Sequence, residues 1–276
     1  MLDTLDLSLA LDKEQYQKEL VELQGRLHRL AFELYKGRRS VVMVYEGWDA
    51  AGKGGSIRRI TEKLDPRGYQ VYAIAAPEGE DREHHYLWRF WRRLITPEDK
   101  QIVIFDRTWY GRVLVERVEG FATLDQWKRA FREINEFERQ LVDANIILVK
   151  LFLHLSKEEQ ERRFKAREVT PHKKWKLTDE DWRNRSKWGE YELATTDMLR
   201  RTSTHRAPWT LIEGDNKYWA RIKALRALVC RVEEELPLTA PLSGATAAAK
   251  SSLEKKKKKK KKGKSSSSGK RRPRRK

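Results

Sequence analysis

The sequence has one cysteine, Cys230, among its 276 residues, so an internal disulfide is excluded. It also has no Cys and His pairs at the spacing of zinc ligands. Its most apolar stretch, residues 146–155, contains a lysine and a histidine and is about half as long as a bilayer-spanning helix. The first residues lack the basic start and the long apolar run of a secretory signal. We therefore expect a cytoplasmic protein without a membrane partner.

Two arrangements that are typical of covalent catalysis are also missing. The sequence has no G-x-S-x-G elbow, and it has no Cys–His arrangement that would suggest a thiol nucleophile. Disorder of the whole chain is excluded as well, because 39% of the residues are hydrophobic and 10% are aromatic. The chain is long enough to bury a sizeable core.

The formal net charge of +19 is distributed unevenly along the chain. Residues 250–276 contain 16 basic residues and one acidic residue, whereas residues 1–249 contain 44 basic and 40 acidic residues. The basic end has few apolar side chains to bury, and the eight lysines at 255–262 repel one another. We therefore expect a folded domain over residues 1–236 and a disordered tail over residues 237–276. Such a tail can bind polyanions.

Helical and strand patterns alternate through the folded part. Apolar residues at steps of three and four predict a long amphipathic helix at 13–36. Short apolar runs predict strands at 40–45, 70–75, 101–105, 146–155 and 209–213, and helical patterns lie at 53–64, 81–94, 123–143, 156–168, 179–200 and 216–236. Continuous apolar strands separated by helices are typical of a parallel sheet covered on both faces. The predicted fold class is α/β, as a three-layer α/β/α domain.

The first predicted strand leads into a glycine-rich loop, Glu-Gly-Trp-Asp-Ala-Ala-Gly-Lys-Gly-Gly at residues 46–55. Gly47, Gly52 and Lys53 fit the G-x4-G-K spacing of a phosphate-binding loop, and the predicted strand and helix around them are its usual context. Glycines let the backbone N–H groups point inward, and the helix N-terminus adds partial positive charge. The loop is therefore predicted to cradle phosphate groups, with the Lys53 ammonium reaching over them.

Two residues distinguish this loop from that of a nucleoside triphosphatase. Gly54 stands where a Ser or Thr hydroxyl would hold magnesium, and Asp49 places a carboxylate inside the anion cradle. Unpaired, this carboxylate would oppose a bound phosphate by about 4 kcal/mol at roughly 4 Å and an effective dielectric constant near 20. A metal ion between the two would reverse the sign of the interaction. Asp49 is therefore predicted to hold Mg²⁺ or Mn²⁺.

A second group of charged residues follows the predicted strand at 101–105. Asp106 stands at the carboxyl end of that strand, where such folds place their second metal-binding carboxylate. Arg107 and Arg112 follow, and their guanidinium groups can bind phosphate oxygens in pairs. An Asp–Arg pair that ties strand to loop is the alternative. Glu116 is a candidate for a further carboxylate near the metal.

A third basic region covers about residues 160–190. Arg163 and Arg167 lie in it, and Pro171 interrupts its helical pattern, as a hinge would. Kinases of this architecture close a helical lid whose basic residues clamp phosphates and exclude water. The sequence therefore predicts a lid here, and a solvated charged face is the alternative for any one of its residues.

Taken together, these motifs resemble those of the polyphosphate kinase 2 family. The matching stretches are residues 47–55, 105–112, 115–121, 175–178 and 207–209, within a similarity that spans about residues 12–236. The resemblance implies a P-loop kinase fold with a lid and phosphoryl transfer between inorganic polyphosphate and a nucleotide. It implies catalytic roles for Asp49, Lys53, Asp106 and Arg107. Phosphate-binding roles are expected for Gly47, Gly52, Gly54, Gly55, Arg112, Arg163 and Arg167, and metal binding for Asp49, Asp106 and Glu116.

The resemblance leaves the acceptor nucleotide open between AMP and ADP. Residues 85–91 and 114–119 look most like the branch that converts AMP to ADP, but members of that branch often have two fused copies of the domain, and this sequence has one. The family resemblance also suggests a homo-oligomer. An ATP-dependent nucleoside monophosphate kinase is the alternative function, and Gly54 in place of Ser or Thr argues against it.

Overall fold

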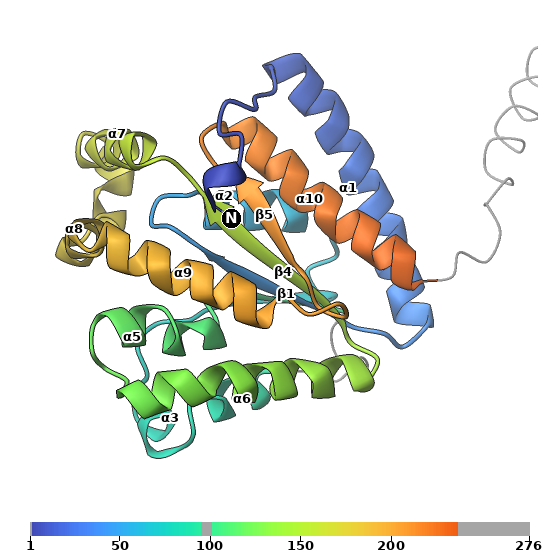
Figure 1. Ribbon diagram of the computed structural model, residues 1–276. Helices are drawn as coiled ribbons and strands as arrows, with labels where there is room; N and C mark the ends of the chain where they lie inside the picture. Colours follow the sequence, from blue (N-terminus) through green and yellow to red (C-terminus); the bar gives the residue numbers. More distant parts are fainter. Residues whose placement is uncertain (1, 95–100, 237–276) are drawn as a thin grey trace, which may run out of the picture. The chain divides into compact units, whose positions relative to one another are not determined.

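The structure, a computed structural model, describes residues 2–94 and 101–236, and at positions 172 and 173 it describes the backbone alone. The tail predicted for residues 237–276 lies outside the described residues. Five parallel strands form one sheet in the order β2-β3-β1-β4-β5 (Figure 1). They are β1 (Val41–Gly47), β2 (Tyr69–Ala73), β3 (Ile102–Asp106), β4 (Ile147–His154) and β5 (Trp209–Glu213).

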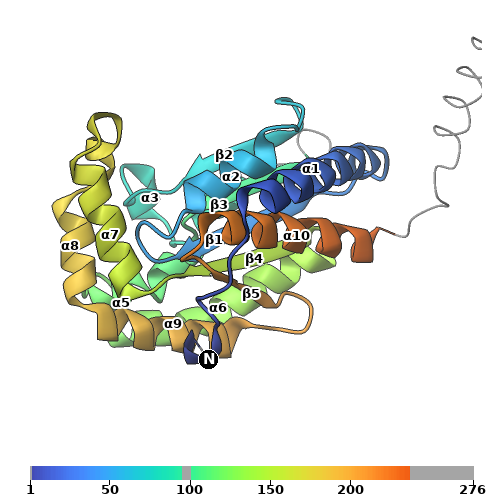
Figure 2. The ribbon, with the colours of Figure 1, turned by 90° about the horizontal axis from the view of Figure 1, so that it is seen from above.

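Helices cover both faces of the sheet, which confirms the predicted three-layer α/β/α class (Figure 2). On one face lie α2 (Lys53–Thr61) and α10 (Lys217–Glu235), with α1 (Lys13–Lys36) packed along α10. On the other face lie α6 (Leu124–Asp143), α9 (Trp188–Thr202) and the short α5 (Val115–Val118). The helix predicted at 13–36 has the predicted bounds, because Asp12 caps its first turn and Gly37 follows its last residue.

The strands β1 and β4 form the centre of the core. Every residue of β4 is buried, and so is β1 up to its last residue, which explains why both read as continuous apolar runs. β4 contains two polar residues, Lys150 and His154. Lys150 is 1% exposed, and its ammonium donates to Glu138 Oε2 at 2.7 Å, to the Thr202 carbonyl at 2.6 Å and to Tyr110 Oη at 3.1 Å. Among the described residues, no helix is long and apolar enough to cross a membrane.

The parallel strands bring several loops to one edge of the sheet, at their carboxyl ends. The glycine-rich loop follows β1, and the 3-10 helix η2 (Trp109–Arg112) follows β3. After β4 the chain forms α7 (Lys157–Glu168), η3 (Pro171–Lys176) and α8 (Asp179–Ser186), which stand together at one side of the sheet (Figure 2). These last three elements occupy the region predicted as a lid, and we call them the lid segment. The remaining short helices are η1 (Leu2–Thr4), α3 (Glu80–Glu83) and α4 (Trp88–Trp91).

Two predicted helices are wrong in their continuity. The helix predicted at 81–94 is broken into α3 and α4, because His84 has extended backbone angles (φ −110°, ψ 166°). The helix predicted at 179–200 is broken at Lys187 into α8 and α9. Ion pairs lie at both breaks: Asp81 of α3 pairs with Arg89 of α4 at 3.3 Å, and Lys187 pairs with Glu119 at 3.1 Å.

Candidate active site

The loop after β1 has the backbone that its glycines predict. Gly47 has φ +134°, and a Cβ there would lie 2.3 Å from the Leu153 carbonyl oxygen of β4, so only glycine fits. Gly52, with φ +106°, is the N-cap of α2. Between them Ala50 also has a positive φ of 61°. The loop therefore turns sharply at three places before α2 begins, which brings its peptide groups around the N-terminus of that helix.

Lys53 lies at the first position of α2 and folds back over the loop. Its Nζ donates to the carbonyl oxygens of Gly47 at 2.8 Å and Trp48 at 3.2 Å. An ammonium at this place stands beside any phosphate that the loop N–H groups bind, and its charge favours an anion there.

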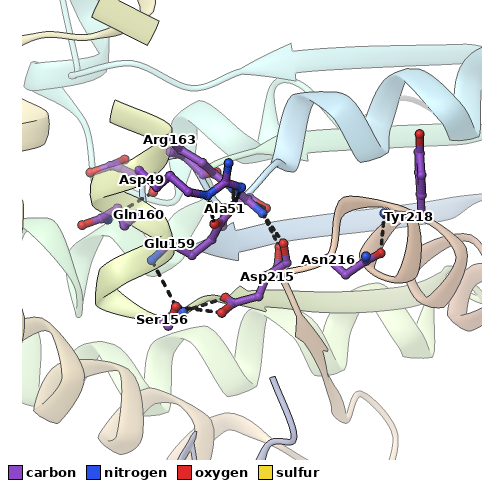
Figure 3. Close-up of polar contacts among 12 residues, drawn as sticks. Asp49, Ala51, Ser156, Glu159, Gln160, Arg163, Asp215, Asn216 and Tyr218 are labelled. Carbon is purple, nitrogen blue, oxygen red and sulfur yellow. Dashed lines mark hydrogen bonds and ion pairs between the residues drawn. The ribbon is translucent and has the colours of Figure 1, made fainter. Parts of the chain in front are cut away.

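Asp49 is held from three sides. Arg107 Nη2 donates to its Oδ1 at 3.2 Å, and Asn184 Nδ2 of α8 donates to its Oδ2 at 3.0 Å. Gln160 Nε2 of α7 donates to the Asp49 backbone carbonyl at 3.1 Å (Figure 3). The structure thus brings together the loop, the end of β3 and the lid segment around one carboxylate.

Arg107 stands between the loop and the lid segment. Its φ of 65° is unusual for a residue other than glycine and turns the chain directly after β3. Its guanidinium also lies 3.9 Å from Glu180 Oε1 of α8. Burial acts to lower the pKa of Arg107, but the charges of Asp49, Glu180, Glu46 and Asp106 outweigh it and raise the pKa. The predicted site residues Asp49, Asp106 and Arg107 therefore share one electrostatic environment.

Glu46 lies beside the candidate site, directly before Gly47, and its sequence pattern did not predict a role for it. It is 5% exposed, and its Oε1 accepts a hydrogen bond of 2.6 Å from Thr108 Oγ1. Burial raises its pKa, while the hydrogen bond from Thr108 and the charges of Lys53 and Arg107 oppose that rise. The sequence feature that could have pointed to Glu46 is its position: it is an acidic residue at the end of an apolar strand, directly before the first loop glycine.

The predicted metal ligands do not form a group of three. Among the described residues, no cluster of three or more His, Cys, Asp or Glu side chains could hold a metal ion. Glu116 of α5 pairs with Arg112 of η2, with 3.1 Å between Oε2 and Nε. Metal binding by Asp49, Asp106 and Glu116 stays a prediction, and two carboxylates would be enough for Mg²⁺, which usually takes its remaining ligands from water and substrate phosphates.

Arg163 does not have the free guanidinium that a phosphate ligand needs. Its side chain is 5% exposed, and its five N–H groups have five protein acceptors within hydrogen-bonding distance (Figure 3). These acceptors are Glu159 Oε1 at 2.6 Å and the carbonyls of Ala50 (2.9 Å), Ala51 (3.1 Å), Gly214 (2.6 Å) and Asp215 (2.9 Å). The prediction of phosphate binding is therefore corrected: Arg163 ties the loop after β1 to α7 and to the loop after β5.

The other two predicted phosphate-binding arginines are partly exposed. Arg112 pairs with Glu116 and lies over the Tyr86 ring, 4.5 Å from its centroid, with 17% of the side chain exposed. Arg167 donates to the Lys176 carbonyl at 3.0 Å and lies 4.0 Å from Asp181. Each guanidinium keeps donors that these contacts do not use, so both stay predictions.

A cavity of about 400 Å³ adjoins this edge of the sheet beside β2. Ala73, the last residue of β2 and the register partner of Asp106, lines it together with Arg89, Arg92 and Arg93. The Arg89 side chain is 10% exposed and lies 3.3 Å from Asp81, which also lines the cavity. The cavity thus lies on the β2 side of Asp106, whereas the loop after β1 and the lid segment lie on the other side.

The fold and the site define a P-loop kinase-like domain: a phosphate-binding loop after the central strand, a carboxylate on the neighbouring strand, and helices next to the loop. Residues 10–239 match the family described as Polyphosphate kinase 2 (PPK2). The chain belongs to this family.

Two relatives and one solved structure show the range of the similarity. The polyphosphate:AMP phosphotransferase of Pseudomonas aeruginosa is 52% identical over 233 residues, which are 84% of this chain and 47% of that protein. The NDP-polyphosphate phosphotransferase 1 of Ruegeria pomeroyi is 40% identical over 228 residues, 82% of this chain and 74% of that protein. A polyphosphate kinase 2 from Arthrobacter aurescens TC1 superposes with a TM-score of 0.81 at 29% identity, over 93% of each chain. The chain spans about half the length of the curated polyphosphate:AMP phosphotransferases that it matches.

Proposed function

We propose that this protein transfers a phosphoryl group between inorganic polyphosphate and a nucleotide, AMP or ADP. One observation carries the proposal: a carboxylate, Asp49, stands inside a phosphate-binding loop and is held there by Arg107 from the end of β3. A loop without the usual hydroxyl after its lysine, but with an internal carboxylate, differs from the ATP-cradling loop of ordinary kinases. Family membership and the names of the relatives support the same reaction.

In the mechanism that we propose, the residues position phosphates and neutralise charge, and no covalent enzyme intermediate forms. The N–H groups of the loop and Lys53 hold the phosphates of the donor, and Arg107 neutralises charge that develops on the transferred group. An oxygen of the acceptor phosphate then attacks in line as the leaving phosphate departs. A divalent cation, Mg²⁺ or Mn²⁺, held by Asp49 and Asp106 would supply further neutralisation of phosphate charge. The lid segment would exclude water during the transfer.

The cavity beside β2 is the place that we propose for the acceptor nucleotide. The loop after β1 and the lid segment lie on one side of Asp106, and this cavity lies on the other, so two phosphate-bearing substrates can meet there. Arg92, whose side chain is 47% exposed, pairs with Glu80 of the same cavity lining at 3.2 Å and keeps further donors that can bind the acceptor phosphate. Arg92→Met should raise the KM for the nucleotide by about 10-fold or more, as expected for one lost charge-assisted hydrogen bond, and should leave the KM for polyphosphate unchanged. Arg82→Met, in the same segment but outside the cavity lining, is the control.

The deciding experiment is a matrix of donors and acceptors with the purified protein. Polyphosphate or ATP is supplied as the sole donor to AMP, ADP, GMP or GDP, and the products are separated by chromatography. Product formation from polyphosphate supports the proposal. Formation of ADP from AMP with ATP alone would instead identify an ATP-dependent nucleoside monophosphate kinase.

In the same assay, Asp49→Asn should lose most activity at every magnesium concentration, and near-normal turnover would contradict the proposed role of Asp49.

The oligomeric state, the cytoplasmic location and the binding of polyanions by residues 237–276 stay predictions. For the tail, the test is truncation after Leu236. If the tail captures long polyphosphate, its removal should raise the apparent KM for long chains more than for short ones. An unchanged dependence on chain length would refute that role.

A further inference from the structure

Asn184 is the one side chain of α8 that donates a hydrogen bond to the loop carboxylate Asp49, across 135 positions of sequence. The orientation of its amide follows from its neighbours. A carboxylate oxygen accepts hydrogen bonds, so the amide nitrogen must face Asp49 Oδ2. The amide oxygen then faces Tyr191 of α9, whose hydroxyl donates to it at 3.1 Å.

Tyr191 is suited to be this donor. Burial, together with the charges of Glu119 and Asp49, raises the pKa of its hydroxyl, which therefore keeps its proton at neutral pH. Glu119, 6% exposed, is the other acceptor near this hydroxyl, but its Oε1 lies farther away, at 3.5 Å, than the Asn184 amide oxygen. Glu119 pairs with Lys187 at 3.1 Å and Arg183 at 3.2 Å. These contacts anchor the C-terminal part of the lid segment.

A second contact joins the same two parts of the chain. Trp48 of the loop stacks on Trp188, the first residue of α9, with ring centroids 3.7 Å apart and an angle of 1° between the planes. The indole Nε1 of Trp48 donates to His154 Nδ1 at 2.9 Å, which holds that ring in place. The base of α8 is thus fixed against the loop, while α8 itself has no buried residue. It is held by the packing of Trp182 on Phe164 of α7, with ring centroids 5.1 Å apart, and by polar contacts, of which that of Asn184 reaches the Asp49 carboxylate.

We infer that Asn184 is a positioning residue that couples the closed position of α8 to the orientation of the Asp49 carboxylate. Asn184 and Arg107 each engage one carboxylate oxygen, and each oxygen keeps a further lone pair for a cation or water. Movement of α8 away from the loop removes the Asn184 contact and leaves the Asp49 carboxylate paired with Arg107, while Gln160 of α7 still binds the Asp49 backbone carbonyl. The role of Asp49 in phosphoryl transfer rests on the proposed function, but the coupling itself is testable without any substrate.

The test is hydrogen exchange of the backbone amides of α8 in the full-length protein without substrate. Asn184→Ala and Asp49→Ala should each speed this exchange by about 10-fold or more, because each removes the same hydrogen bond to a charged group. The double variant should exchange no faster than the faster single variant. Ser186→Ala, in the same helix, is the matched control, since its hydroxyl bonds only to the Arg183 carbonyl.

Two further variants sharpen the result. Asn184→Asp places a second carboxylate beside Asp49 and should speed exchange more than Asn184→Ala does. Tyr191→Phe removes the hydrogen bond to the Asn184 amide oxygen but keeps the bond from Asn184 to Asp49, so it should have a smaller effect. The variants within α8, at Asn184 and Ser186, should melt within about 2 °C of the wild type, because α8 contributes no buried side chain. The inference is overturned if Asn184→Ala exchanges like Ser186→Ala, or if the effects of the two single variants multiply in the double variant. Kinetics give an independent readout: Asn184→Ala should lower kcat and leave the KM for the nucleotide unchanged.

Discussion

Replacing Arg163 by methionine tests whether this side chain supports the loop or binds substrate. Methionine fills a similar volume but donates no hydrogen bond, so the carbonyls of Ala50, Ala51, Gly214 and Asp215 lose their partner. Removal of one member of a buried charge pair costs about 3–5 kcal/mol. Glu159 keeps its pair with Arg162, so the lower end, about 3 kcal/mol, is expected.

For a domain of this size, a loss of that magnitude lowers the melting temperature by about 6–12 °C. The measurement is thermal unfolding followed by circular dichroism. The matched control is Arg162→Met: Arg162 is the neighbouring residue and pairs with the same Glu159, but its side chain is 68% exposed. An exposed pair contributes about 0–1 kcal/mol, so the control should lower the melting temperature by at most about 4 °C.

The result that would refute this reasoning is specific. If Arg163→Met melts like the wild type but raises the KM for polyphosphate, Arg163 binds phosphate directly and the correction made from the structure is wrong. Arg163→Lys adds an intermediate case. A lysine has three donors, so it can satisfy at most three of the five acceptors and should lose less stability than methionine.

Four other substitutions have expected outcomes that unfolding experiments can check. Gly47→Ala should cost at least about 3 kcal/mol, because its Cβ would meet the backbone of β4, whereas Gly54→Ala meets no atom within 4 Å and should leave stability nearly unchanged. Lys150→Met should cost about 3–5 kcal/mol at pH 8, and part of this should return at pH 5.5, because the folded variant then protonates the buried Glu138, whose pKa is already raised by burial. Thr123→Ala removes a capping box and should cost about 1 kcal/mol. Equal melting temperatures of the two glycine variants would contradict the steric reason. A loss of stability in Lys150→Met that does not depend on pH would contradict the role of Glu138. An unchanged stability of Thr123→Ala would contradict the contribution of the capping box.

Local sequence was sufficient where neighbouring residues supply the stabilising contacts. Thr123 and Gln126 have the spacing of a capping box, and the box is present in full at the start of α6. Ser156 and Glu159 have the same spacing at the start of α7, but only half of the box forms: the Ser156 side chain accepts from the Glu159 N–H, whereas the Glu159 carboxylate bonds to Arg162 and Arg163. The difference arises because a buried arginine competes for that carboxylate, and burial was not readable from the sequence.

Side chains with distant partners were assigned less well. In a continuous helix over 81–94, Trp91 would share one face with Leu87, Trp88 and Leu94. The helix is broken at His84, and Trp91 is 43% exposed. Lys150 and His154 were visible as polar residues in an apolar run, but the sequence did not show that Glu138 and Trp48 are their partners.

The sequence by itself determined the alternation of strands and helices, the phosphate-binding loop with its internal Asp49, and the uneven distribution of charge. Each of these depends on spacing or composition along a short stretch. The tertiary structure alone decided which basic and polar side chains form hydrogen bonds with the loop after β1. It buried Arg163 as a structural tie and placed Asn184 on Asp49. The physical reason is distance along the chain. Arg163 and Ala50, like Asn184 and Asp49, lie more than 100 residues apart, so no local sequence pattern links them. They meet only because β4 and the lid segment fold back beside β1.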